Sequence, residues 1–318
     1  METLPVLTLR QSNASDIEVY SKLIAMTVVG AEEAIGSNMM GGFVNLVARR
    51  LEEELGVPKG NDIGKVLSWF NTSTVLRLNT YRVRGRLVRD EEKGPAFYMI
   101  AYECPIRQIL YLEDLPGGRS LCMIICRLLS RVLSNSLGSA CRVEPARIGP
   151  NACLLRASIS GSVRGKVEEL NVVSQSPSIK EYEELLRGFF SALLRSIGWA
   201  LNTLLGGNPA MSYRAGKSYG RLVGASILAQ GYEANSLEEA VNIFNSAMQE
   251  LLRIRLQGSI IVAEKSRFDE IIEKEGIRHA EFIKRIIQGF IAGSLETLLA
   301  RRVDLRLLGG NKFEVIMR

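Results

Sequence analysis

The last forty residues, His279 to Arg318, change from a helical to a strand-like spacing of apolar positions. From Phe282 to Leu299 apolar side chains recur every three or four residues, which predicts one long helix with a wide apolar face. Apolar and polar residues then alternate over Val303–Leu307 and Phe313–Met317, which predicts two strands. Gly309-Gly310-Asn311 lies between them and tolerates positive φ, so a hairpin is expected.

The same plan occurs earlier, between Ser120 and Ser158. With a shift of 160 residues, Val143, Gly149 and Asn151 fall on Val303, Gly309 and Asn311. With a shift of 162, the N-terminal helical patterns of the two halves align as well, and Tyr20 falls on Tyr182. We interpret these matches as an internal duplication. The alternative is two unrelated α+β halves of similar composition.

The fold class predicted is therefore α+β, with two duplicated domains that each pack helices on a small antiparallel sheet. We expect domains at 1–160 and 178–318, joined by a polar linker at 161–177. Gly41-Gly42 is expected to interrupt the first helical pattern. A glycine-rich helix is expected from Arg214 to Gln230, and its small residues at every fourth position, like Gly289 and Gly293 later on, are expected to let helices approach closely. The halves are expected to pack through their N-terminal helices, with Tyr20 and Tyr182 in or beside the contact.

Composition and charge narrow the class of protein only modestly. The chain has 318 residues, of which 47% are hydrophobic and 23% charged, and its net charge is +6. This composition is ordinary for a globular protein. No apolar run reaches the ~18 residues of a membrane span, and Met1–Ser15 lacks the pattern of a signal peptide, so a cytoplasmic location without a membrane span is expected.

Three motifs carry a resemblance to a known family. Gly216-x-x-x-Gly220, the stretch Gln288–Gly293 and the terminal hairpin Val303–Val315 are similar to the 4-vinyl reductase-like small-molecule-binding domain. In the first half Cys122, Glu144, Gly149 and Cys153 stand near family positions. The resemblance implies two such domains in tandem, related in fold to the TRAPP vesicle-tethering subunits. Where zinc-binding members carry cysteines, this chain has Phe282, Arg306, Phe313 and Arg147.

Metal binding and catalysis are weakly indicated. The five cysteines lie between Cys104 and Cys153, and only Cys122, Cys126, Cys141 and Cys153 offer a zinc alternative. Core packing is the preferred interpretation of these thiols, and no cofactor is expected. The single histidine, His279, has no clear partner, and Gly216-Lys217-Ser218 lacks the context of a phosphate loop. We therefore do not expect an enzyme.

Arginines alternate along Arg77–Arg89, which makes a basic strand. No nucleic-acid-binding motif accompanies it, so a solvated outer face is the preferred interpretation. Nucleic-acid-associated regulation is retained as the third hypothesis.

The ligand site expected from the sequence is an apolar gap between helices and sheet. It would be lined by Phe189, Phe190, Phe244, Phe282, Ile286 and Phe290. The first hypothesis is a non-catalytic binding or sensor protein for a small hydrophobic ligand. The second is a TRAPP-like interaction scaffold whose halves form a pseudo-dimer, with a protein partner or a homo-oligomer as its assembly.

Overall fold

The structure is a computed structural model that describes residues 16–59, 63–81, 88–90, 94–115, 120–149, 152–160, 178–205, 208–248, 251–264, 266–277 and 280–318. The chain divides into two compact units, each with its own core. We call the unit of Ser37–Leu204 the central unit, and the unit of Met1–Gly36 with Leu205–Arg318 the terminal unit. The linker predicted at 161–177 lies outside the described residues.

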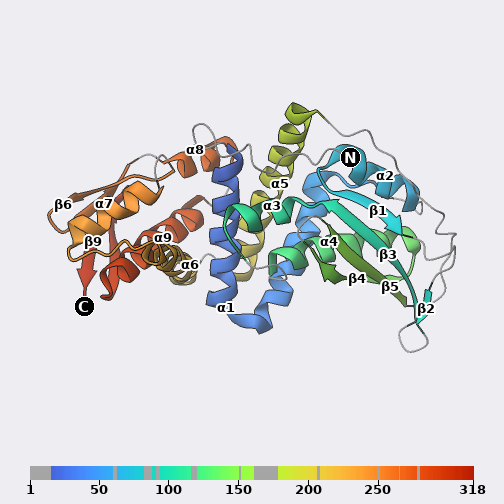
Figure 1. Cartoon of the computed structure of the whole chain (residues 1–318), viewed down its shortest axis with the longest axis horizontal. Coiled ribbons are helices and arrows are strands. Elements are labelled where there is room, and N and C mark those ends of the chain that lie inside the picture. Colours follow the sequence, from blue (N-terminus) through green and yellow to red (C-terminus); the bar gives the residue numbers. More distant parts are fainter. Residues whose placement is uncertain are drawn as a thin grey trace. The chain divides into compact units, whose positions relative to one another are not determined.

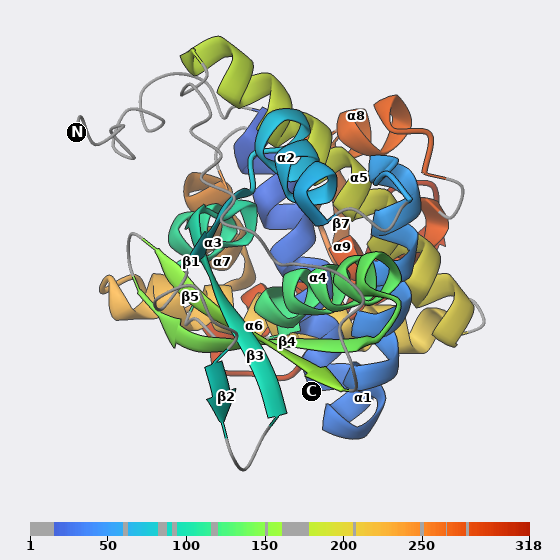
Figure 2. The ribbon, with the colours of Figure 1, turned by 90° about the vertical axis from the view of Figure 1, so that its right-hand side faces the viewer.

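The central unit contains the second part of α1 (Asp16–Leu55) and a sheet covered by helices. Its further elements are α2 (Ile63–Ser73), β1 (Arg77–Tyr81), β2 (Val88–Asp90), β3 (Gly94–Glu103), α3 (Pro105–Leu112), α4 (Ser120–Leu137), β4 (Ala140–Ile148), β5 (Cys153–Ser160) and α5 (Ile179–Leu205). The sheet order is β1-β3-β5-β4, with β2 paired to β3, and all pairs are antiparallel. Helix α4 packs along this sheet (Figure 2).

The terminal unit contains the first part of α1 and a second, four-stranded sheet (Figure 1). Its further elements are α6 (Pro209–Ala229), α7 (Leu237–Met248), β6 (Ile254–Gln257), β7 (Ile260–Ala263), α8 (Arg267–Lys274), α9 (Ala280–Leu299), β8 (Val303–Gly309) and β9 (Lys312–Met317). The sheet order is β6-β7-β9-β8, again antiparallel throughout. The predicted α+β class and the terminal helix with its hairpin are confirmed.

The two sheets have the same strand order when their strands are numbered along the chain, leaving aside the short β2. An asparagine fixes the first strand to the preceding helix in both units. Asn71 exchanges two hydrogen bonds with the backbone of Leu78, at 2.8 and 2.6 Å. Asn245 does the same with Ile254, at 2.8 and 2.9 Å. This agreement in order and in detail is what an internal duplication requires.

The compact units do not coincide with the predicted domains 1–160 and 178–318, because the first helix of each half belongs to the other half's unit. In the terminal unit Tyr20 of α1 donates a hydrogen bond to Glu275, which follows α8, and Asp16 pairs with Arg267 at 2.7 Å. In the central unit Gln108 of α3 lies 3.4 Å from the hydroxyl of Tyr182 on α5. Tyr20 and Tyr182 thus each contact a residue of the other half of the sequence within one unit, and the expected packing of the two first helices against each other stays a prediction. The domains 1–160 and 178–318 were predicted from periodicity, which shows that a helix buries a face but not which partner covers it.

The break in α1 differs from the prediction. Helical structure continues through Gly41-Gly42, and the single non-helical residue within α1 is Gly36, with φ 73° and ψ 164°. Glycine adopts this left-handed φ without a Cβ clash, so it can redirect the chain from the terminal to the central unit. The predicted turn at Gly309-Gly310 is confirmed, with φ values of 138° and 55°.

Candidate functional site

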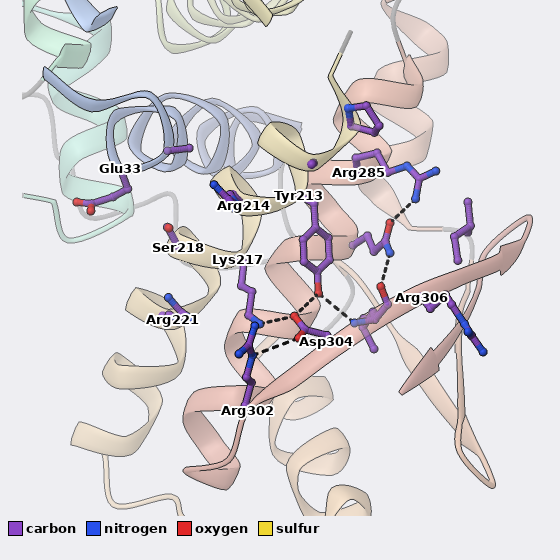
Figure 3. A pocket seen from close by; sticks show the side chains of 16 residues that line it. Glu33, Tyr213, Arg214, Lys217, Ser218, Arg221, Arg285, Arg302, Asp304 and Arg306 are labelled. Carbon is purple, nitrogen blue, oxygen red and sulfur yellow. Dashed lines mark hydrogen bonds and ion pairs between the residues drawn. The ribbon is translucent and has the colours of Figure 1, made fainter. Parts of the chain in front are cut away.

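An open cleft of about 850 Å³ lies in the terminal unit, where α6, α9 and β8 meet beside the last turn of α1's first part (Figure 3). Its lining is Glu33, Ala34, Pro209, Ala210, Tyr213, Arg214, Lys217, Ser218, Arg221, Arg285, Gln288, Arg302, Asp304, Leu305, Arg306 and Leu307. Six of these residues are basic and two are acidic. This cleft is the candidate functional site.

Glycines on α6 and α9 position the helices that form the cleft. A Cβ on Gly216 would lie 1.8 Å from the carbonyl oxygen of Ile286, and one on Gly289 would lie 2.0 Å from that of Tyr213. No side chain can be accommodated at such distances, so the two helix backbones touch. The prediction that these glycines permit close helix packing is confirmed. The contact places Tyr213 and Lys217 of α6 directly against β8.

Lys217 is the centre of a polar network in the floor of the cleft. Its Nζ donates to the carbonyl oxygen of Val303 and to Oδ1 of Asp304, both at 2.7 Å, and lies 2.9 Å from Oε2 of Glu296. Only 8% of Lys217 is exposed, so its ammonium group exchanges contacts with water for contacts with these three oxygen atoms. The carboxylates offset the cost of burying its charge.

The same network completes the free edge of the terminal sheet. β8 is an edge strand, and Val303 and Leu305 point their backbone groups away from β9. The amide of Val303 donates to Glu296 at 3.0 Å, and that of Leu305 donates to the hydroxyl of Tyr213 at 3.0 Å. The carbonyl oxygen of Leu305 accepts from Gln288 at 2.8 Å. Helix side chains thus satisfy backbone groups that would otherwise be open to strand addition.

Electrostatics fix the protonation states of the floor. Burial raises the pKa of Asp304, but the hydrogen bond and charge of Lys217, with the charge of Arg302, outweigh it and hold the pKa below the usual value. For Glu296 burial is likewise outweighed by hydrogen bonds from Lys217, Val303 and Arg221. Burial, opposed by the amide of Leu305 and assisted by Asp304, raises the pKa of Tyr213 to about 12. At neutral pH both carboxylates are ionised and the phenol is protonated.

Five arginines form the walls above this floor. Arg214 of α6 is exposed and lines the cleft. The others contact Glu296, Gln288, Asp304 or Glu314 through one or two of their nitrogen atoms. A guanidinium carries five N–H donors, so each arginine keeps donors for an anion. The cleft can therefore bind carboxylate or phosphate groups.

The six apolar residues proposed from the sequence as a ligand site are core residues. All six are buried, with at most 6% of any of them exposed, and none lines the cleft. Phe189 and Phe190 belong to the central unit, whereas Phe244, Phe282, Ile286 and Phe290 belong to the terminal unit. The rings of Phe244 and Phe290 pack with centroids 5.8 Å apart. An apolar ligand at these residues stays a prediction.

The cysteines are free thiols. Burial raises the pKa of Cys126 and of Cys141 to about 12, so both are protonated at neutral pH. Cys104, which the sequence interpretation left out, is close enough to Cys122 and Cys153 for their charges to interact, whereas Cys141 is not part of this group. Among the described residues no three histidine, cysteine or acidic side chains are placed to hold a metal ion.

Two other sequence features fall wholly or partly outside the described residues. His279 lies outside them, as do residues 82–87 of the basic strand, of which β1 and β2 are described.

In the described part of the chain, one helix, α4, has the length and composition of a membrane span, and 67% of that window is buried within the fold. Its burial identifies α4 as a core helix.

The residues of the cleft were missed by the sequence interpretation. They come from four separate segments, and the only signals were Tyr213 and Lys217 one turn apart on the glycine-rich helix and the alternation Arg302-x-Asp304-x-Arg306. Each signal alone indicates an ordinary polar face.

Comparison with known proteins identifies no relative: no family model, no curated protein and no solved structure matches the chain.

Proposed function

We propose that the protein is a non-catalytic binding protein that takes up a small anionic molecule in the cleft of its terminal unit. The observation that carries the proposal is the convergence of five arginines and Lys217 on one open cleft, against two lining carboxylates. The volume of about 850 Å³ lies within the range of small-molecule sites. Arginine is the side chain best suited to carboxylate and phosphate recognition.

The protonation states of the floor favour binding over acid–base catalysis. A general acid or base works best with a pKa near the operating pH. The pKa of Tyr213 is raised to about 12, far from neutral pH, and Lys217 holds Asp304 and Glu296 in the ionised state. Glu296 and Tyr213 also accept hydrogen bonds from the amides of Val303 and Leu305 at the edge of β8, so proton transfer at either group would disturb the sheet.

The other hypotheses from the sequence stay proposals. The repeated strand order supports two similar domains, in keeping with the proposed likeness to 4-vinyl reductase-like domains. A hydrophobic ligand, a TRAPP-like scaffold role and nucleic-acid association have no comparable observation in their favour.

Calorimetric titration with inorganic pyrophosphate tests the proposed function. We expect binding that weakens as salt is added, because exposed charges are screened. Arg214→Glu should weaken binding by at least about 10-fold, since a charge-assisted hydrogen bond contributes about 1.5–3 kcal/mol. Arg253→Glu is the matched control, because Arg253 is an exposed arginine of the same unit outside the cleft. Absence of binding, or equal losses in both variants, would refute the proposal.

A further inference from the structure

The arginines of the cleft are arranged in two groups rather than one. Figure 3 shows Arg285 and Arg306 on one side of Tyr213, and Arg214, Arg221 and Arg302 on the other. We call these groups the first pole and the second pole. The spacing of these arginines along β8 and α6 explains why the two groups are separate.

Arg302 directly precedes β8, and Asp304 and Arg306 share one face of that strand, because side chains alternate between faces. Arg302 and Arg306 are four residues apart, which corresponds to about 13 Å along the strand. On α6, Arg214 and Arg221 are seven residues apart, two helical turns or about 10 Å, and both belong to the second pole. The second pole is therefore elongated and presents several donors.

The middle of the cleft is unsuited to an anionic group. Along the chain Asp304 stands between Arg302, which directly precedes β8, and Arg306 of β8, and its carboxylate is ionised. The ring of Tyr213 lies beside it, and its hydroxyl is occupied by Leu305 and Asp304. Lys217, the one cation here, is buried and already bound to three oxygen atoms. An anionic group of a ligand placed here would face the carboxylate of Asp304, while the nearby ammonium of Lys217 is already paired.

We propose, resting on the proposed function, that the ligand class is an elongated dianion, with a phosphate or carboxylate group at each end and an uncharged spacer between them. The first pole binds one terminal group and the second pole binds the other. The spacer lies over Tyr213 and Asp304 and spans the distance of about 13 Å that separates Arg302 from Arg306 along the strand. Once one end is bound, the other is held near its pole at an effective concentration of the order of millimolar.

A series of linear α,ω-alkanediol bisphosphates with two to ten carbon atoms tests this inference, with the corresponding alkyl monophosphates as references. We expect affinity to rise to a maximum at intermediate length, where the bisphosphate binds at least about 10-fold tighter than the monophosphate. Arg214→Gln at the second pole should reduce this advantage to less than about 2-fold. Arg306→Gln at the first pole should do the same, and both side chains are exposed, so the fold should be retained.

The outcomes separate this inference from the proposed function. If bisphosphates of every length bind no tighter than monophosphates while pyrophosphate still binds, the two-pole inference is overturned and the anion site stands. If neither pyrophosphate nor any member of the series binds, both proposals fail. If the length optimum is present but survives either substitution, the poles are assigned to the wrong residues and the inference is likewise overturned.

Discussion

At the scale of single residues, the backbone contact between α6 and α9 depends on glycines, which have no side chain. Gly216 and Gly220 lie against carbonyl oxygens of Ile286 and Phe290, where a Cβ would come within 1.8 and 2.2 Å. The spacing of these glycines in the sequence predicted close helix packing. It did not predict which helix would be the partner, because glycine periodicity carries no information about the facing surface.

Gly216→Ala should lower the free energy of unfolding by about 3 kcal/mol or more, because the methyl group must push two packed helices apart. Gly188→Ala is the control, since an added Cβ at this helical position meets no atom within 4 Å. That control should be neutral or stabilising by up to about 1 kcal/mol. Urea denaturation of both variants provides the measurement, and equal stabilities would contradict the packing described.

Lys217→Met should destabilise the protein by about 3 kcal/mol at pH 7, because Asp304 and Glu296 lose the cation that compensates their burial. Lys284→Met, at an exposed position of α9, should have little effect. Urea denaturation at several pH values measures both.

The same variant carries a pH signature. Folding lowers the pKa of Asp304 and of Glu296, so their stabilisation is complete above the unfolded values, about 3.9 and 4.3, and is lost as the pH falls through the lower folded values. The difference between wild type and Lys217→Met should therefore be largest above about pH 5 and shrink on acidification. A difference that stays constant down to pH 3 would show that Lys217 acts through packing alone.

At the scale of elements, periodicity predicted the terminal helix with its hairpin and the earlier copy of both. It missed α3, which has only eight residues, and it placed the break of α1 at Gly41-Gly42 instead of Gly36. A helix tolerates exposed glycines at a cost of about 1 kcal/mol each, so a glycine pair alone does not end one. The cleft escaped prediction because its lining converges from segments far apart in the chain.

The hydrogen bonds that Asn71 and Asn245 make at the two helix–strand junctions can be tested by substitution. Asn71→Ala should cost about 2 kcal/mol, because it leaves the amide and carbonyl of Leu78 unpaired in a buried place. Asn245→Ala should cost about 1 kcal/mol, because Asn245 is only partly buried and water can replace it. Asn242→Ala on the exposed face of α7 is the control. Thermal denaturation that ranks the three variants differently would argue against the equivalence of the two helix–strand junctions.

At the scale of the whole molecule, the exchange of first helices joins the two halves of the sequence. The first part of α1 is covalently part of residues 1–160 but completes the terminal unit, and α5 is part of residues 178–318 but completes the central unit. Val19 and Leu23 on α1, and Phe189 and Leu193 on α5, are buried and lie in units that the other half mainly builds. Neither half contains a complete unit.

This topology predicts that cutting the chain between the halves will not separate them. A protease site inserted at 161–177 should yield two fragments that co-elute in size-exclusion chromatography and unfold together, because each fragment supplies a helix to the other's core. Expressed alone, residues 1–160 and 178–318 should be largely unfolded or aggregate, since each would expose the surface that the missing helix covers. Leu23→Asp combined with Leu193→Asp places charges in both cores and should release the cleaved fragments. If the cleaved wild-type fragments separate without denaturant, and each is folded by circular dichroism, the first helices do not complete the opposite units.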